Sequence, residues 1–95
     1  ASDFLLQIED VKWTVLAGQV HDNIVISVRN VGYTRHAGTF IHKWFSDIGT
    51  AGGHRAMAKA IVPVNEFNNK FGTLKPDELT SLFGDLAAQF IHEAS

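Results

Sequence analysis

The sequence predicts an α+β fold in which helices pack on a small mixed β-sheet, with the elements in the order ββαβα. Two apolar, β-branched runs come early in the chain and are separated by a short polar segment, which is typical of a leading hairpin. Two later segments repeat apolar residues at helical spacing, and a third apolar run lies between them. Because the connections are short throughout, we expect a single domain over residues 1–95.

The leading hairpin is predicted over residues 14–20 and 24–29, because residues 21–23 (His-Asp-Asn) make a short polar turn between them. Successive side chains of a strand point to opposite faces of the sheet, which sorts the second strand into two sets. One face carries Ile24, Ile26 and Val28, and the other carries Val25, Ser27 and Arg29. Residues 4–8 fit either a short strand or a helical turn.

The first helix is predicted over residues 35–48, where apolar residues follow the spacing i, i+3, i+4, i+7, i+8, i+11. These residues are Ala37, Phe40, Ile41, Trp44, Phe45 and Ile48. The stripe is expected to pack on the sheet, so its aromatic rings belong to the core and do not stack on bases. Trp13 precedes a strand, and its exposure and stacking on a ligand stay open. The helix is expected to end at Gly49.

The remaining elements are a buried strand, a loop and a long helix. Residues 58–64 are predicted to form the strand, and Pro63 indicates an edge position or the end of that strand. Residues 65–75 are expected to be a polar loop. A last helix begins at Pro76, since proline and the acidic residues after it suit a first helical turn. Its apolar stripe comprises Leu79, Leu82, Phe83, Leu86, Ala87, Phe90 and Ile91.

Composition narrows the class of protein. A hydrophobic content of 45% in 95 residues is enough for a core, and a net charge of −2 argues against a strongly electrostatic nucleic-acid binder. The chain has no cysteine, which excludes disulfides and thiolate sites. No apolar run approaches the ~20 residues of a membrane span, and no signal peptide is recognisable. We expect a cytoplasmic protein without membrane contact. A start at Ala1 fits a piece of a longer protein.

The segment Gly52-Gly53-His54-Arg55 is predicted to be an anion-binding turn. Two adjacent glycines allow a positive φ and a close approach to a ligand, so that backbone N–H groups can point at phosphate or carboxylate oxygens. The side chains of His54 and Arg55 would add donors. Arg29 ends an apolar strand upstream, and its planar fork suits a bidentate grip on the same anion.

The same residues also have ordinary structural interpretations. His54 can be a surface or capping histidine, and Arg29 can be a strand-end charge in a surface ion pair. The two glycines can serve only as a turn. Arg35 and His36 lie where the first helix starts, which favours a solvated cap. Lys59 either extends the positive rim of the site or is an outward-facing strand lysine.

The motif resembles the C-terminal DHH-associated domain of the DHH phosphoesterases, which include RecJ-type, oligoribonuclease-like and exopolyphosphatase-like enzymes. The resemblance rests on the Ile-Ser-Val-Arg strand at 26–29 and on Gly-Gly-His at 52–54 followed by alanine-rich sequence, and it covers roughly residues 22–65. It implies that Arg29 and His54 bind substrate phosphate. Two departures leave the substrate open: Ala51 replaces a further glycine, and Met-Ala-Lys at 57–59 replaces the common Ala-Ala-Gly.

The resemblance implies a substrate-binding lobe that holds a nucleotide, an oligonucleotide or polyphosphate for hydrolysis at a two-metal site on an N-terminal DHH domain. Such sites use manganese or magnesium held by Asp and His clusters. The aspartates here are scattered singly and no Asp-His-His run occurs, so we expect no catalytic residue and no metal in this chain, and no activity from it alone.

Two alternatives stay open beside the phosphoesterase lobe. One is a nucleic-acid or nucleotide-binding module without linked hydrolysis, such as the related segment of alanyl-tRNA synthetases. The other is a dimerisation domain that forms a homodimer and in which the glycine turn has only a structural role.

Overall fold

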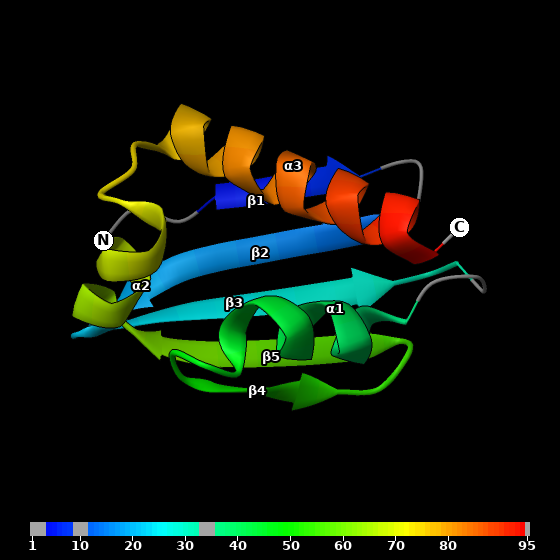
Figure 1. The fold of residues 1–95 in the computed structure, drawn as a ribbon, viewed down its shortest axis with the longest axis horizontal. Helices are drawn as coiled ribbons and strands as arrows, with labels where there is room; N and C mark the ends of the chain where they lie inside the picture. The colour runs from blue at the N-terminus through cyan, green and yellow to red at the C-terminus, as the bar shows by residue number, and fades with distance from the viewer. Residues whose placement is uncertain (1–3, 9–11, 33–35, 95) are drawn as a thin grey trace.

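The computed structural model describes residues 4–8, 12–32 and 36–94, and these form one five-stranded sheet with three helices (Figure 1). The strand order is β1-β2-β3-β5-β4, and every neighbouring pair is antiparallel. The strands are β1 Phe4–Ile8, β2 Trp13–Val20, β3 Asn23–Asn30, β4 Thr50–Gly53 and β5 Met57–Pro63. The helices are α1 Ala37–Phe45, α2 Val64–Phe71 and α3 Pro76–Ala94. The predicted α+β class is confirmed, whereas the sheet that we expected to be mixed is antiparallel throughout its described strands. The element order is βββαββαα instead of ββαβα, because residues 4–8 and 50–53 add strands and residues 64–71 add a helix.

Several predicted elements are found with small shifts of their ends. The hairpin is β2 and β3, and its turn includes His21 in the left-handed region, with a φ of 54°. Residues 4–8 form a strand, which pairs with β2. The first helix is shorter than its apolar stripe, because the backbone turns after Phe45. Pro63 ends β5, as predicted for a strand terminus.

Two predictions about the connections were wrong. Residues 65–75 do not form a loop throughout, because 64–71 is the helix α2. Its three apolar residues are Val64, which the prediction placed at the end of the preceding strand, and Phe67 and Phe71, which lie one turn apart and whose rings are 5.0 Å apart. Gly52 and Gly53 do not form a turn directly after the helix, since they belong to the edge strand β4, which pairs with β5.

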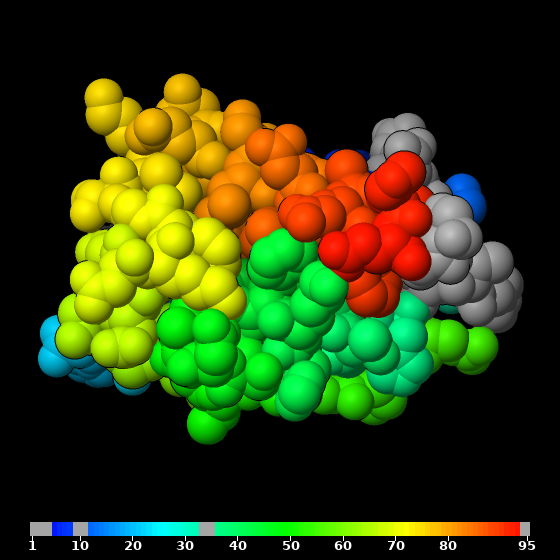
Figure 2. Space-filling view, viewed as in Figure 1, coloured from blue at the N-terminus to red at the C-terminus, as the bar shows by residue number. Residues whose placement is uncertain are grey.

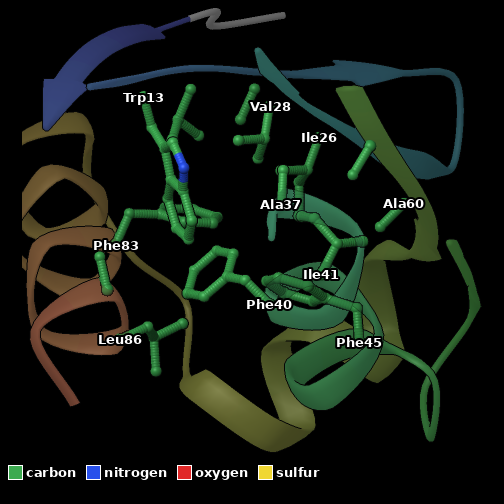
Figure 3. Packing of buried hydrophobic residues seen from close by; sticks show 14 of the residues in the cluster. Trp13, Ile26, Val28, Ala37, Phe40, Ile41, Phe45, Ala60, Phe83 and Leu86 are labelled. Atoms are coloured by element: carbon green, nitrogen blue, oxygen red, sulfur yellow. The ribbon is translucent and has the colours of Figure 1, made fainter. Parts of the chain in front are cut away.

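The core lies between one face of the sheet and the three helices, whose atoms cover that face in Figure 2. Trp13, Val15 and Ala17 of β2 alternate inward, and so do Ile26 and Val28 of β3. Trp13 is 1% exposed and reaches from β2 toward Phe40 (Figure 3), with the ring centroids 4.8 Å apart. Its stacking on a ligand is therefore excluded in this conformation.

The predicted helical stripes pack as expected, with one qualification. Phe40 and Phe45 are fully buried, whereas Trp44 is half-buried and carries Lys43 Nζ 5.5 Å from its ring centre. The α3 stripe is buried at Phe83, Leu86, Ala87 and Phe90, with Leu79, Leu82 and Ile91 partly buried beside it.

The other face of the sheet is not covered by any described element, and we call it the open face. Five of the six large apolar side chains that are exposed among the described residues lie on it: Leu5, Leu16, Val20, Met57 and Ile61. None of the described helices is both long and apolar enough to cross a membrane.

Candidate phosphate-binding site

The structure brings Arg29 and the segment after the two glycines to the same end of the sheet. Arg29, near the end of β3, pairs with Met57 at the start of β5. The amide of His54 donates to the carbonyl of Met57 at 2.8 Å, which closes the tight turn between β4 and β5. Met57 therefore connects the two basic residues, and the turn lies beside the end of β3 (Figure 1).

The N-terminus of α1 fixes this turn from the other side. The amide of Ala37 donates to the carbonyl of Arg55 at 3.3 Å, and the amide of Gly38 donates to the carbonyl of His54 at 3.1 Å. A Cβ on Gly38 would lie 2.7 Å from the carbonyl oxygen of Gly53, so only glycine permits this approach. These first helical amides are consequently occupied by the turn and are not offered to an anion.

Asn30 is a site residue that sequence reasoning missed. It is 6% exposed, and its Nδ2 donates to the carbonyl of Arg55 at 2.9 Å while its own amide donates to the carbonyl of Ala56 at 2.8 Å. Its Oδ1 accepts from the amide of Gly32 at 2.8 Å. Asn30 thus joins the end of β3 to the turn and holds Arg29, its neighbour, at a fixed place beside it. The sequence feature that could have indicated this role is a polar residue at a strand position that faces the core.

The two glycines of the motif differ in what the fold requires of them. Gly53 has a φ of 150°, and a Cβ there would lie 2.4 Å from the carbonyl oxygen of Met57 and 2.5 Å from Cα of Ala58. Gly53 is therefore needed for the turn itself. A Cβ on Gly52 would meet no atom within 4 Å. The lack of a side chain at Gly52 leaves exposed backbone with open space above it, where a ligand can approach closely.

Two of the turn amides are satisfied within the turn. His54 donates its amide to Met57, and the amide of Ala56 donates to Nδ1 of His54 at 3.2 Å. The anion donors expected from this segment are thus mainly side chains. With Nδ1 accepting, the neutral imidazole carries its proton on Nε2, and that N–H is a donor for a ligand on this exposed side chain.

The charged side chains of the site are basic and exposed. Arg29, Arg55 and Lys59 are all exposed, and neither Arg29 nor Lys59 forms an ion pair with a described residue. The ordinary interpretation of Arg29 as half of a surface ion pair thus finds no described partner. The ordinary interpretation of His36 as a helix cap agrees with the structure, because its Nδ1 accepts from the amide of Thr39 at 3.1 Å at the start of α1. Arg35 lies outside the described residues.

The arrangement is suited to binding an anion. It offers a guanidinium, an imidazole N–H and a stretch of backbone free of side-chain bulk. Among the described residues, no three His, Cys, Asp or Glu side chains gather in a way that would hold a metal ion. Comparison of the chain with protein-family models, with curated proteins and with solved structures finds no match.

Proposed function

We propose that this chain is the substrate-binding lobe of a DHH-family phosphoesterase and that it grips a phosphate group of a nucleotide, an oligonucleotide or polyphosphate. One observation carries the proposal. Arg29 and His54, far apart in the sequence, both contact Met57 through backbone pairing, at the end of the sheet where exposed basic side chains gather. This juxtaposition supports the phosphate-binding roles that the Gly-Gly-His resemblance implies for the two residues.

Each residue has a distinct part in the proposed grip. The guanidinium of Arg29 donates two parallel hydrogen bonds to a pair of phosphate oxygens, which fixes the orientation of the phosphate. Nε2–H of His54 donates to a third oxygen, and Arg55 adds positive charge beside it. Gly52 lets the bound group come close to the backbone, and Gly53 and Asn30 hold the turn in position.

Hydrolysis itself belongs to a different part of the enzyme in this proposal. The two divalent metal ions, manganese or magnesium, are held by an N-terminal DHH domain and activate the attacking water. The lobe described here positions the substrate against that centre. A cytoplasmic location suits such an enzyme, and a chain without cysteine is compatible with it.

The test is a titration of the 95-residue chain with a nucleoside 5′-monophosphate, followed by amide NMR. We expect the largest shifts at residues 29–30 and 51–56. Arg29→Ala and His54→Ala should each weaken binding by about 1–3 kcal/mol, because each removes a charge-assisted hydrogen bond. Arg29→Lys should restore binding only in part, since lysine offers no planar fork.

A matched control is Lys75→Ala, which removes an exposed lysine just ahead of α3, on the helical side of the molecule. It changes the net charge as Arg29→Ala does and should leave binding unchanged. The proposal fails if both site variants bind as the parent does, or if the shifts gather at α1 and α3 and leave the turn unmoved.

A further inference from the structure

Lys59 lies on the open face next to the proposed phosphate site. In the cross-strand rows of the sheet it stands between Ser27 of β3 and Gly52 of β4. Arg29 pairs with Met57, two residues before Lys59 on the same strand, so the two cations are diagonal neighbours on one face. Diagonal neighbours in antiparallel sheets are about 7–8 Å apart, which long side chains span easily.

Among the described residues, the charged side chains of the open face are the two cations Arg29 and Lys59, although the net charge of the chain is negative. The net charge is −2, yet the described acidic side chains lie on the helices, on the segment after α1 and in the β2–β3 turn. They are Asp22, Asp47, Glu66, Asp77, Glu78, Asp85 and Glu93. No described acidic residue stands on the open face beside Arg29 and Lys59. Two like charges that share a face with no acidic neighbour among the described residues repel each other and attract an anion that bridges them.

The space beside Lys59 is open on the side of β4. Gly52, the direct neighbour of Lys59 across β4 and β5, has no atom within 4 Å of the position that a Cβ would take. Ser27 flanks Lys59 on the other side with a small hydroxyl side chain. An extended ligand can therefore lie along the line from Arg29 to Lys59, with Ser27 on one side of that line and the exposed side chain of Met57 on the other.

We propose that Lys59 binds a second phosphate of the ligand, adjacent to the phosphate held by Arg29 and His54. The inference rests on the proposed function, and it narrows the substrate class to molecules with neighbouring phosphates: short oligonucleotides, joined by phosphodiesters, or polyphosphate, joined by anhydrides. A single-phosphate nucleotide uses only half of the site. Lysine suits this second position because it offers a mobile point charge that follows a phosphate whose orientation is already fixed by the arginine.

A protein surface that carries carboxylates is the competing occupant, since Leu16 and Ile61 of the open face are exposed beside the cations. A phosphate ligand is favoured because Lys59 lies next to the proposed Arg29–His54 site. It is also favoured because the fold does not require a glycine at position 52, and a glycine beside a lysine lets an anion approach the backbone closely. A second copy of the chain is disfavoured, because two such faces would bring cations together.

The test compares three ligands by amide NMR titration of the 95-residue chain: a nucleoside 5′-monophosphate, a 5′-phosphorylated dinucleotide and inorganic tripolyphosphate. The parent should bind the dinucleotide about tenfold more tightly than the mononucleotide, the value of one added charge-assisted contact. Lys59→Gln should abolish that gain and leave the mononucleotide affinity unchanged, while Arg29→Ala should weaken both. Tripolyphosphate separates the two ligand classes. Tighter binding than the mononucleotide by tripolyphosphate alone identifies an anhydride-linked ligand, and tighter binding by the dinucleotide identifies a nucleic acid.

Lys75→Gln is the control, because it removes the same charge at an exposed position outside the open face. The inference is overturned if the parent binds one and two phosphates equally, if Lys59→Gln weakens the mononucleotide as much as the dinucleotide, or if tetraglutamate binds as tightly as the dinucleotide with the same dependence on Lys59. These outcomes leave the Arg29 and His54 result intact. Failure of the proposed function shows instead as Arg29→Ala and His54→Ala variants that bind the mononucleotide like the parent.

Discussion

The side-chain amide of Asn30 donates to the backbone carbonyl of Arg55 at 2.9 Å, and this bond joins the end of β3 to the turn between β4 and β5. Asn30 is 6% exposed, and it is the one polar residue among the buried side chains of the described chain. The carbonyl of Arg55 also accepts from the amide of Ala37 at 3.3 Å, so the side chain of Asn30 supplies one of its two described donors. The position of Arg29 relative to His54 therefore depends on a neighbour that touches no ligand.

Replacing Asn30 by alanine should lower the free energy of unfolding by about 1–3 kcal/mol, because it removes two side-chain hydrogen bonds, one to the carbonyl of Arg55 and one from the amide of Gly32, each worth about 0.5–1.5 kcal/mol. Chemical denaturation measures this loss. Asn69→Ala is the control, since Asn69 is exposed on α2. Phosphate affinity should fall as well in the folded Asn30→Ala variant. An unchanged affinity would show that the turn keeps its geometry without this bond.

Gly53→Ala and Gly52→Ala should behave in opposite ways although the residues are adjacent. Gly53→Ala should destabilise the fold by about 2 kcal/mol or more, because alanine meets both a positive φ and backbone atoms at 2.4 and 2.5 Å. Gly52→Ala should leave stability unchanged or raise it by about 0.4–1 kcal/mol, since its side chain enters open space.

Phosphate affinity tests the proposed role of Gly52 in ligand approach separately from the structural role of Gly53. Gly52→Ala should bind a nucleoside monophosphate more weakly while its thermal midpoint stays at or above the parent value. A Gly52→Ala protein that binds like the parent would mean that the ligand does not approach this stretch of backbone.

The elements with a strong internal pattern were predictable from the sequence. The alternation in β2 and β3 and the apolar stripes of α1 and α3 reflect periods of two and 3.6 residues. The strand β4 has no such pattern, because Thr-Ala-Gly-Gly has little intrinsic β propensity and becomes a strand only through pairing with β5. The helix α2 has only three apolar residues, Val64, Phe67 and Phe71, and the first of them continues the apolar run of β5 in the sequence.

The site was predictable only in part, because some of its residues are recognisable from local sequence and others only from tertiary contacts. Arg29 and His54 stand out by residue type and by the glycines, which are local features. The role of Asn30 arises only when β3 and the β4–β5 turn are adjacent, which is a tertiary contact. Trp13 was left open, yet it shares the inward alternation of Val15 and Ala17, and that register predicts its burial.

Trp13→Ala should be among the most destabilising single substitutions in this chain. Trp13 is 1% exposed and lies within 4.8 Å of Phe40 and 5.9 Å of Phe90, measured between ring centres. Truncation of such a residue costs about 3–5 kcal/mol, a large share of the stability of a small domain. Trp44→Ala should cost clearly less, because Trp44 is only half-buried.

Urea denaturation of both variants checks this order. Trp13→Phe tests the loss of ring volume without the loss of a hydrogen bond, because the buried indole Nε1 of Trp13 has no hydrogen-bond partner among the described residues. The phenylalanine variant should therefore lie much nearer to the parent than the alanine variant. Equal losses for Trp13→Ala and Trp44→Ala would contradict the packing described here.

Acid should weaken one contact between α1 and α2 selectively. Lys70 Nζ donates to Asp47 Oδ1 at 2.9 Å and to the carbonyl of Trp44 at 2.6 Å, which joins α2 to the end of α1. The hydrogen bond from Lys70 holds the pKa of the Asp47 carboxyl below its ordinary value of 3.8. Because the folded pKa is the lower one, the contribution of Asp47 to stability is full above pH ~4 and disappears as the pH falls through the folded pKa.

The parent should therefore be more stable than Asp47→Asn at pH 6, and the two should converge as the pH falls below 3.8. The effect should be small and salt-sensitive, since the Asp47 side chain is 61% exposed and solvent screens the pair. Urea midpoints at pH 6 and below pH 3 measure the difference. Asp85→Asn, an exposed aspartate on α3 without a described ion pair, is the control. A gap between parent and Asp47→Asn that is the same at both pH values would mean that the charge of Asp47 contributes nothing, and that the variant acts through side-chain packing alone.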